Sequence, residues 1–221
     1  MGSCKRYFRM TYPLSEQTLP AAVQELVERD GSFAKIVSRH SLPPLWQREP
    51  GFATLIHIIL EQQVSLASAN AAYKRLQSKL QPLTPGGFLT LTDADLRQVG
   101  FSRQKTSYGR ALANAVVDKS LDLATLDQLD DQQVRDQLMK IKGIGLWTAN
   151  IYLLLALKRP DIWPSGDLAL HTAIQQLKGL PKRPTSAEAQ AMSTAWQPWR
   201  AVAARLLWHF YLTERQQTMP Q

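Results

Sequence analysis

The sequence predicts an all-α protein, and three observations support this fold class. Apolar residues recur at the three- and four-residue spacing of a helix in segment after segment. Residues that start or stop helices, namely proline, serine, threonine and glycine, flank these segments. No segment alternates apolar and polar residues in the manner of a half-buried strand, and no internal repeat is visible.

The first two predicted helices follow an irregular stretch, residues 1–19. One begins at Pro20, whose fixed φ suits a helix start, and runs to about Arg29, just before Gly31. The next covers Phe33 to about Arg39 and ends ahead of two adjacent prolines.

The central helices differ in how much of their surface is apolar. Residues 52–62 are apolar on most sides, which predicts a buried core helix. The helix that begins at Ser65 instead carries one apolar stripe, formed by Leu66, Ala69, Tyr73, Leu76 and Leu80. Residues 82–87 are predicted to be a loop. Two helices with threonine or serine N-caps, residues 93–99 and 103–117, follow it.

A compact turn with two glycines then interrupts the helical pattern. It spans Lys142 to Leu146 and separates a helix that begins at Asp130 from a helix over residues 147–157. Glycine accepts positive φ and lets another backbone approach closely. The sequence therefore predicts two helices joined by a tight hairpin.

The same turn has the features of a phosphate-binding site. Gly145 directly precedes a helix start, where free N–H groups attract anions. Lys140 and Lys142 add positive charge, and Ile144 between the two glycines can pack inward and pin the helices together. We therefore expect the turn to bind one phosphate of a nucleic-acid backbone.

A loop with one proline and one glycine, residues 161–166, follows Pro160 and leads from this hairpin to Asp167. Asp167 begins an apolar helix over residues 168–177, where an ordinary N-cap role would explain it. Its position about twenty residues after the phosphate-binding turn gives it further interest. Two more helices, residues 187–196 and 199–213, complete the predicted elements.

Composition narrows the classes of function. The 221 residues include 26 Lys+Arg and 18 Asp+Glu, and the net charge of +8 suits a polyanionic partner. One cysteine, Cys4, excludes an internal disulfide and a four-cysteine metal site. The four histidines show no metal-ligand spacing, so no catalytic metal is expected. The longest apolar run, residues 151–157, is too short to span a membrane, and no secretory signal is visible.

Several of these motifs together resemble one protein superfamily. The turn GIGLWTAN followed by PSGD is similar to the helix–hairpin–helix superfamily of DNA base-excision glycosylases, in particular its DNA-3-methyladenine glycosylase II (alkyladenine) branch. The segments LEQQVS, VGFSRQK and WQPWR, followed by LWH, also resemble segments of that family. In all, the resemblance covers roughly residues 45–213.

The resemblance implies two helical lobes around a DNA-binding cleft. Residues 51–158 would form a central lobe that carries the helix–hairpin–helix motif, and residues 1–50 with 159–221 would form the second lobe. The implied partner is double-stranded DNA containing alkylated bases, with no membrane contact and a monomeric protein. The expected location is the cytoplasm and nucleoid of a bacterium, or the nucleus of a eukaryotic cell.

The resemblance also implies that Asp167 is catalytic. Cleavage of an N-glycosidic bond builds positive charge on the sugar, as in glycoside hydrolysis, and a carboxylate beside the sugar stabilises that charge. It would also orient or deprotonate the attacking water. An alkylated purine is itself positively charged, so it leaves without much help from an acid. This role and the N-cap role are compatible.

Bifunctional members of the superfamily carry a lysine where this chain has Trp147, and that amine attacks the sugar through a Schiff base. We therefore expect base release without strand cutting. Trp147 and Trp208 are the expected walls of the base pocket, with Tyr152 and Trp163 as further candidates, because a ring stacked on a cationic purine gains cation–π energy. The alternative for these residues is a core position. Relatives often carry an aromatic residue at the position of Ile151, so the range of accepted bases stays open.

The other expected sites contact DNA. A flipped nucleotide leaves a gap in the base stack, and by position Gln63 is the expected wedge, with Gln62 beside it; a solvated helix end is the alternative. The expected phosphate contacts lie at two turns: Lys140, Lys142, Gly143, Ile144, Gly145 and Thr148 at the first, and Arg103 and Lys105 at the second. No cofactor is expected, although hairpins of this family can hold a structural Na⁺ or K⁺ on their backbone carbonyls.

Two other functions fit part of the sequence. A helix–hairpin–helix module that binds DNA without catalysis would explain the turn and the charge, but neither Asp167 nor the tryptophans. A mismatch or oxidised-base glycosylase of the same fold would also explain the hairpin. Its commonest forms, however, carry a cysteine cluster or the catalytic lysine, which this chain lacks.

Overall fold

The computed structural model describes residues 13–217, and within them the chain forms helices and no strand. Cys4 lies outside the described residues. The all-α prediction is therefore confirmed for the part of the chain that is described. Every helix in this part is too short or too polar to cross a membrane.

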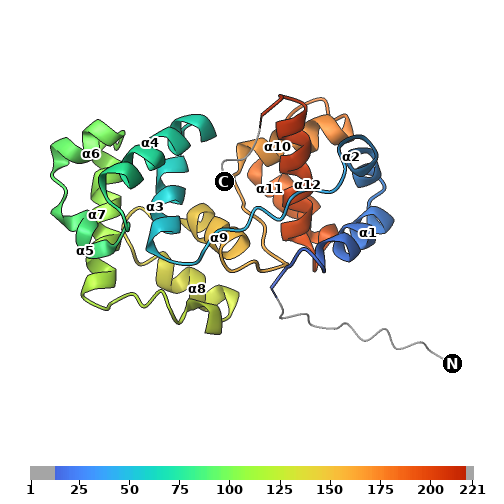
Figure 1. The fold of residues 1–221 in the computed structure, drawn as a ribbon. Helices are drawn as coiled ribbons and strands as arrows, with labels where there is room; N and C mark the ends of the chain where they lie inside the picture. The colour runs from blue at the N-terminus through green and yellow to red at the C-terminus, as the bar shows by residue number, and fades with distance from the viewer. Residues whose placement is uncertain (1–12, 218–221) are drawn as a thin grey trace.

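The helices form two lobes that lie side by side (Figure 1). The first lobe contains α3 (Phe52–Glu61), α4 (Leu66–Lys79), α5 (Pro85–Thr90), α6 (Asp93–Val99), α7 (Arg103–Val117), α8 (Asp131–Leu138), α9 (Leu146–Leu155) and a 3₁₀ turn (Leu126–Gln128). The second contains α1 (Leu19–Arg29), α2 (Ser32–His40), α10 (Leu168–Lys178), α11 (Ser186–Ser193), α12 (Arg200–Thr213) and a 3₁₀ turn (Thr194–Trp196). The exact limits of the two lobes, at residues 50 and 158, stay a prediction.

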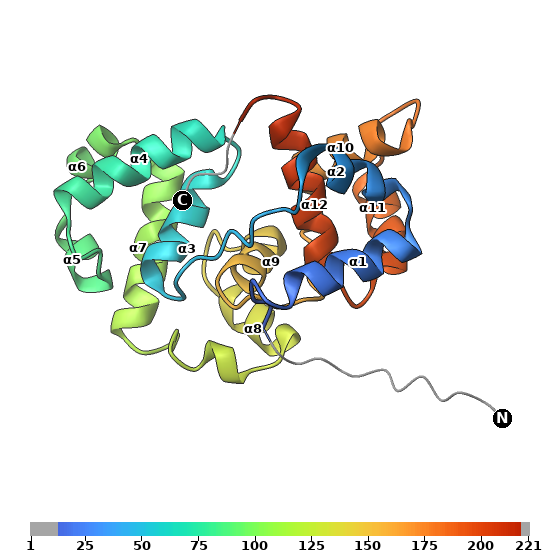
Figure 2. The same ribbon diagram turned by 45° about the vertical axis from the view of Figure 1, so that its right-hand side comes forward.

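One apolar helix forms the centre of each lobe. Helix α3 packs against α4, α7 and α9, and all its residues except Ala53 are buried. Helix α12 packs against α1, α2 and α10, so the second lobe joins the beginning of the chain to its end (Figure 2). The prediction of a buried core helix at residues 52–62 is confirmed.

A buried arginine joins the two lobes. The side chain of Arg205 on α12 is fully buried and donates hydrogen bonds to the carbonyls of Leu45 (2.8 Å), Leu154 (2.8 Å) and Ala201 (3.1 Å). Burial lowers the pKa of Arg205 to about 9. Because Leu154 lies in α9 and Leu45 in the linker that enters α3, this one side chain ties α12 of the second lobe to the first lobe and to that linker.

The capping signals located most helix starts, and one helix was missed. Thr92, Ser102 and Asp130 accept the expected N-cap hydrogen bonds at the starts of α6, α7 and α8. The predicted loop at residues 82–87 is correct for residues 82–84 and wrong from Pro85 on, because Thr84 accepts a hydrogen bond from the Gly87 N–H and caps the start of α5. The two glycines of α5, poor helix formers, hid it from the sequence pattern.

Candidate functional site

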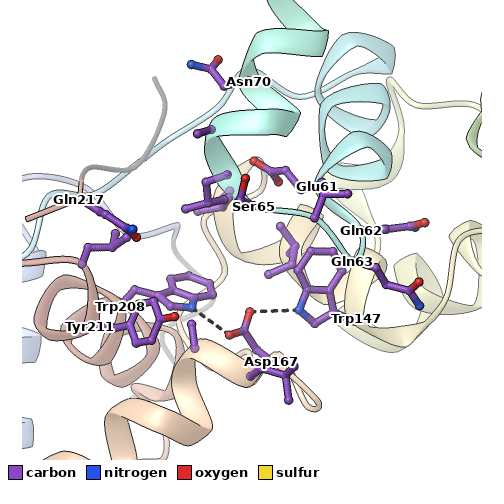
Figure 3. Close-up of a pocket in the computed structure, with 18 of the residues that line it drawn as sticks. Glu61, Gln62, Gln63, Ser65, Asn70, Trp147, Asp167, Trp208, Tyr211 and Gln217 are labelled. Carbon is purple, nitrogen blue, oxygen red and sulfur yellow. Dashed lines mark hydrogen bonds between the residues drawn. The ribbon is translucent and has the colours of Figure 1, made fainter. Parts of the chain in front are cut away.

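A cleft of about 1300 Å³ lies between the two lobes (Figure 3). Its walls come from the α3–α4 turn, the start of α9, the start of α10 and the end of α12. Asp167, Trp147 and Trp208 all line it, so the cleft contains three of the residues that the sequence marked.

The carboxylate of Asp167 is held from three sides. Its Oδ2 accepts a hydrogen bond from the indole Nε1 of Trp147 at 3.2 Å. Its Oδ1 accepts from the indole Nε1 of Trp208 at 3.4 Å and from the backbone N–H of Leu170 at 3.1 Å. The contact with Leu170 is the N-cap of α10, so capping and a position in the cleft coexist.

The loop that carries Asp167 is tied to both lobes. In α9, the Asn150 side chain accepts a hydrogen bond from Arg135 Nε (2.8 Å) and donates one to the Trp163 carbonyl (3.0 Å). At the start of α12, Arg200 forms a two-pronged ion pair with Asp161 (2.7 and 2.9 Å). These contacts hold the loop against α9 and α12.

Aromatic rings stand on both sides of Asp167. Trp147 is partly exposed on α9, and Trp208 is 4% exposed on α12, with the carboxylate between their indoles (Figure 3). Tyr211, one helical turn after Trp208, also lines the cleft, and the guanidinium of Arg215 lies 3.9 Å from its ring centroid. The sequence interpretation missed Tyr211, although its three-residue spacing from Trp208 on one helix face was a usable signal.

Two of the predicted pocket residues do not line the cleft. Tyr152 is fully buried, its hydroxyl accepts a hydrogen bond from the Gly51 N–H at 3.0 Å, and burial raises its pKa to about 12. Trp163 is buried and packs against Trp196 with ring centroids 5.4 Å apart. We therefore correct both assignments. Helix α9 is apolar all round, so the sequence does not show which of its faces meets the cleft.

The two glycines of the hairpin have different roles. Gly143 has φ +90°, and a Cβ built on it would lie 2.0 Å from the ring of Tyr108. Gly145 has φ −96°, and nothing lies within 4 Å of a Cβ built there. The fold therefore requires glycine at residue 143, whereas residue 145 faces open space.

Helix α9 begins without a side-chain cap, unlike α10. Gly145 is its N-cap residue, and the N–H groups of Leu146, Trp147 and Thr148 have no acceptor among the described residues. Lys140 and Lys142 are exposed beside them and form no ion pair within residues 13–217. This combination of free donors and unpaired cations suits an anion.

Other groups of the hairpin are already bonded inside the protein. The Ile144 side chain is buried, and its N–H donates to the Ile141 carbonyl at 3.0 Å. The Thr148 hydroxyl accepts from the Gln62 side chain at 3.0 Å, and the Gly143 carbonyl accepts from the same amide at 2.9 Å. The Ile144 N–H is therefore not a phosphate donor, which corrects that part of the expectation, whereas the Thr148 hydroxyl only accepts in this bond and keeps its own proton, so its phosphate contact stays a prediction. A structural cation on the hairpin carbonyls stays a prediction.

The α3–α4 turn separates the roles of the two predicted wedge residues. Gln62 is engaged with the hairpin through the two hydrogen bonds of its amide. Gln63 is exposed at the edge of the cleft, with a positive φ of 57°. Of the two, only Gln63 has a side chain free to enter a base stack.

The turn before α7, the second of the two predicted phosphate-binding turns, contributes one exposed cation. Arg103 is exposed at the start of α7 and lines a shallow groove together with Lys142. Lys105 instead donates from Nζ to the Leu60 carbonyl at the end of α3 (2.7 Å), and burial lowers its pKa. The prediction that Lys105 binds phosphate is therefore corrected, because its ammonium group caps a helix.

An ion pair that the sequence interpretation missed also lines the cleft. Arg48 NH2 and NH1 donate to Glu61 Oε1 (2.6 Å) and Oε2 (3.1 Å). A lone carboxylate at the end of the apolar helix α3 was a signal that a partner exists. The partner lies in an irregular linker, however, and no pattern in the sequence identifies it. Among the described residues, no group of three or more His, Cys, Asp or Glu side chains is placed to hold a metal ion.

Comparisons with family models, protein sequences and solved structures all find similarity to DNA repair proteins. The model of the family described as "HhH-GPD superfamily base excision DNA repair protein" matches residues 56–201. The protein YfjP of Bacillus subtilis is 28% identical over 185 residues, which cover 80% of this chain and 64% of that protein. This chain therefore spans less than two thirds of the length of YfjP.

Two further matches come from Schizosaccharomyces pombe. The protein named DNA-3-methyladenine glycosylase 1 is 28% identical over 180 residues, covering 80% of this chain and 79% of that protein. The solved structure of 3-methyladenine DNA glycosylase (Mag1) in complex with abasic DNA superposes with a TM-score of 0.78 at 25% identity. It covers 90% of this chain and 97% of that chain.

Proposed function

We propose a function from the premise that this chain belongs to the HhH-GPD superfamily of base excision DNA repair proteins. The proposed function is that of a monofunctional DNA glycosylase, which extrudes alkylated purines of the 3-methyladenine and 7-methylguanine type from double-stranded DNA and hydrolyses the N-glycosidic bond. One observation carries it, namely the Asp167 carboxylate held between two indoles in a cleft next to the hairpin. The relatives named as 3-methyladenine glycosylases support the substrate class.

In the proposed reaction the hairpin holds the DNA strand and the cleft receives the extruded nucleotide. The free N–H groups at the start of α9, with Lys140 and Lys142, bind a phosphate. Gln63 enters the gap left in the base stack, because it projects from the edge of the same cleft. Extrusion is easiest for a damaged base, and this favours the alkylated nucleotide before any contact with the pocket.

Asp167 then acts on the sugar. As the glycosidic bond breaks, positive charge develops on the deoxyribose, and the nearby carboxylate stabilises it. The same carboxylate orients the attacking water and accepts its proton. Two indole N–H donors keep the carboxylate in place, and no cofactor takes part in this reaction.

The walls of the cleft suit a cationic base. Trp147 and Trp208 present electron-rich rings from opposite sides, and stacking on a positively charged purine contributes roughly 1–2 kcal/mol where water is excluded. A neutral purine gains less from the same stack. The proposed selection is therefore by charge.

The absence of a lysine near Asp167 supports base release without strand cutting. Trp147 stands at the start of α9, and no lysine lines the cleft within residues 13–217. Without an amine the sugar cannot form a Schiff base with the protein. Borohydride treatment on damaged DNA should therefore give no covalent adduct, and an adduct would contradict the monofunctional assignment.

The proposed partner is alkylated double-stranded DNA, bound by a single copy of the protein. Both lobes of one chain contribute to the cleft, so a second subunit is not needed to complete it. We propose the compartment that holds the genome as its location, the bacterial cytoplasm and nucleoid or the eukaryotic nucleus.

One assay tests the function. The protein and its Asp167→Asn variant are incubated with methylated DNA, and free 3-methyladenine and 7-methylguanine are measured. Because an asparagine oxygen can still accept from the Leu170 N–H, the variant keeps its helix cap and should fold. We expect base release by the wild type and a rate lower by at least about 100-fold in the variant. No release by either protein would leave only a DNA-binding module.

A further inference from the structure

Glu61 lines the cleft across from Asp167 (Figure 3) and forms a buried ion pair with Arg48, which also lines the cleft. Glu61, at the end of α3, is 9% exposed and is held by the two nitrogens of the Arg48 guanidinium at 2.6 and 3.1 Å. Arg48 is itself fixed, because its backbone N–H donates to the Leu155 carbonyl at 3.0 Å. The proposed mechanism gives this pair no task.

The carboxylate of Glu61 has more acceptor capacity than the protein uses. An ionised carboxylate offers about four acceptor positions on its two oxygens, and Arg48 occupies two of them. His57 does not fill the others, because its Nε2 lies 3.7 Å from Oε1 and is without a hydrogen-bond partner. Burial lowers the pKa of His57 to about 4, so its ring is neutral at pH 7. The two remaining positions therefore have no hydrogen-bond donor among the described residues, and Glu61 belongs to the lining of the cleft.

Stability does not account for the pair. Charges at this depth lose hydration, and apolar residues of similar volume are often as stabilising as a buried ion pair. The neighbours of Glu61 on α3, Ile58 to Leu60, are fully packed apolar residues. A carboxylate placed in such a helix, facing the cleft and fixed by a guanidinium, has the properties of a preorganised acceptor.

The geometry of the cleft limits what this acceptor can meet. The two indoles stand on either side of the space for the base, and Asp167 is placed for the sugar. The edge of the base would then face the wall of the cleft across from Asp167, where Glu61 lies (Figure 3). Extruded bases are commonly read through hydrogen bonds to their Watson–Crick edge. On that edge a guanine-type base presents its N1–H and 2-amino groups, and an adenine-type base presents its 6-amino group.

We propose that Glu61 is a specificity-determining residue, which accepts hydrogen bonds from the N–H groups on the Watson–Crick edge of the extruded purine, and that Arg48 is the residue that positions its carboxylate. The proposal rests on the proposed glycosylase function and adds a second criterion to it. The indoles select for positive charge on the ring, and Glu61 selects for amino groups on its edge. A carboxylate disfavours a base that presents only acceptors there, because lone pairs would face lone pairs.

The test compares two cationic bases that differ in one amino group. Duplexes carrying a single 7-methylguanine or a single 7-methylhypoxanthine are treated with wild type and Glu61→Gln, and kcat/KM is measured for each. Each value is divided by the spontaneous depurination rate of the same duplex, which removes the difference in leaving ability. We expect the wild type to prefer 7-methylguanine, and the preference to fall by about tenfold in the variant, since a bond to an ionised acceptor is lost. Glu28→Gln, on the exposed face of α1, serves as the matched control and should keep the wild-type ratio.

A second variant guards against the possibility that the single substitution impairs folding. Glu61→Gln leaves Arg48 buried without its partner, so Arg48→Met combined with Glu61→Gln removes both charges together. The double variant should show the same loss of preference. A wild-type ratio in either folded variant overturns the proposal, even if the overall rate falls, because a purely structural pair would affect both bases equally. Absence of release by the wild type would instead overturn the proposed function, and the inference with it.

Discussion

The indole N–H of Trp147 donates to Oδ2 of Asp167 across 3.2 Å, and this bond connects the hairpin directly to the carboxylate in the cleft. Trp147 is the second residue of α9, so a residue whose backbone N–H belongs to the proposed phosphate site also orients the proposed catalytic group through its side chain. The hydrogen bond thereby fixes the carboxylate relative to the start of α9, where the phosphate is proposed to bind.

Replacing Trp147 with phenylalanine separates the two roles of its ring. Phe keeps an aromatic face for the base but cannot donate to Asp167, and a hydrogen bond to a charged group is usually worth about 1.5–3 kcal/mol. We expect the single-turnover rate of base release to fall roughly tenfold or more, with little change in affinity for undamaged DNA. Trp208→Phe should have a smaller effect, since its bond is longer at 3.4 Å. Equal rates for Trp147→Phe and wild type would show that the indole does not position Asp167.

The two hairpin glycines should respond differently to alanine. Gly143→Ala forces a Cβ into the ring of Tyr108 at a positive φ, so the free energy of unfolding should fall by more than about 1 kcal/mol. Gly145→Ala meets no protein atom within 4 Å and should leave thermal stability near that of the wild type. If residue 145 lies against a phosphate, the same variant should bind duplex DNA more weakly. Denaturant titration and fluorescence anisotropy measure the two effects, and identical behaviour of the two variants would contradict this division.

Lys142 and Lys105 provide a matched pair for the electrostatic part of binding. Lys142 is exposed and unpaired in the described structure, so Lys142→Gln should reduce the salt dependence of DNA affinity by about one unit of slope. Lys105 caps the Leu60 carbonyl, so Lys105→Gln should lower stability and leave that slope nearly unchanged. Affinity measured from low to high salt distinguishes them. A lower slope for the Lys105 variant would restore it as a phosphate contact.

Asp30 should make the second lobe sensitive to acid. Burial alone would raise the pKa of Asp30, but hydrogen bonds from Lys178, Ser32 and Trp196 outweigh it and lower the pKa to about 2. A carboxyl with a lowered pKa stabilises the folded state above its ordinary value of 3.8, and this stabilisation is lost as the pH falls through about 2. Asp30→Asn should therefore lower the Tm at pH 7, and the difference from wild type should shrink between pH 3.8 and 2.

The control for this prediction is Asp136→Asn, a substitution on the exposed face of α8. Its difference from wild type should be small at every pH. A Tm difference for Asp30→Asn that stays constant down to pH 2 would show that the ionised carboxylate is not the source of the stabilisation.

The features that sequence predicted well are local ones. N-caps at Thr92, Ser102, Asp130 and Asp167 depend on residues three positions apart, and the structure has all four. The hairpin was also recognisable, because its two glycines and the flanking helices lie within one short segment.

The features that sequence predicted badly depend on tertiary packing. Tyr152 and Trp163 looked like pocket residues, but helix orientation turns both into the core. Lys105 looked like a surface cation, and only the end of α3, packed against it, shows that it caps a carbonyl. The pair of Arg48 and Glu61 joins a linker to a helix end, and neither segment carries a pattern that names the other.

Arg205 lies in α12 and hydrogen-bonds to carbonyls of segments that are synthesised earlier, and this has a consequence for the order of folding. During synthesis α1 and α2 leave the ribosome before α3 to α9, yet α12, the helix that carries Arg205 and against which they pack, is translated after all of these. The seven helices from α3 to α9 can meanwhile assemble on their own early contacts. The nascent polypeptide therefore acquires its hairpin well before the opposite wall of the cleft exists, and ribosome-bound chains truncated before α12 should lack any place for an extruded nucleotide.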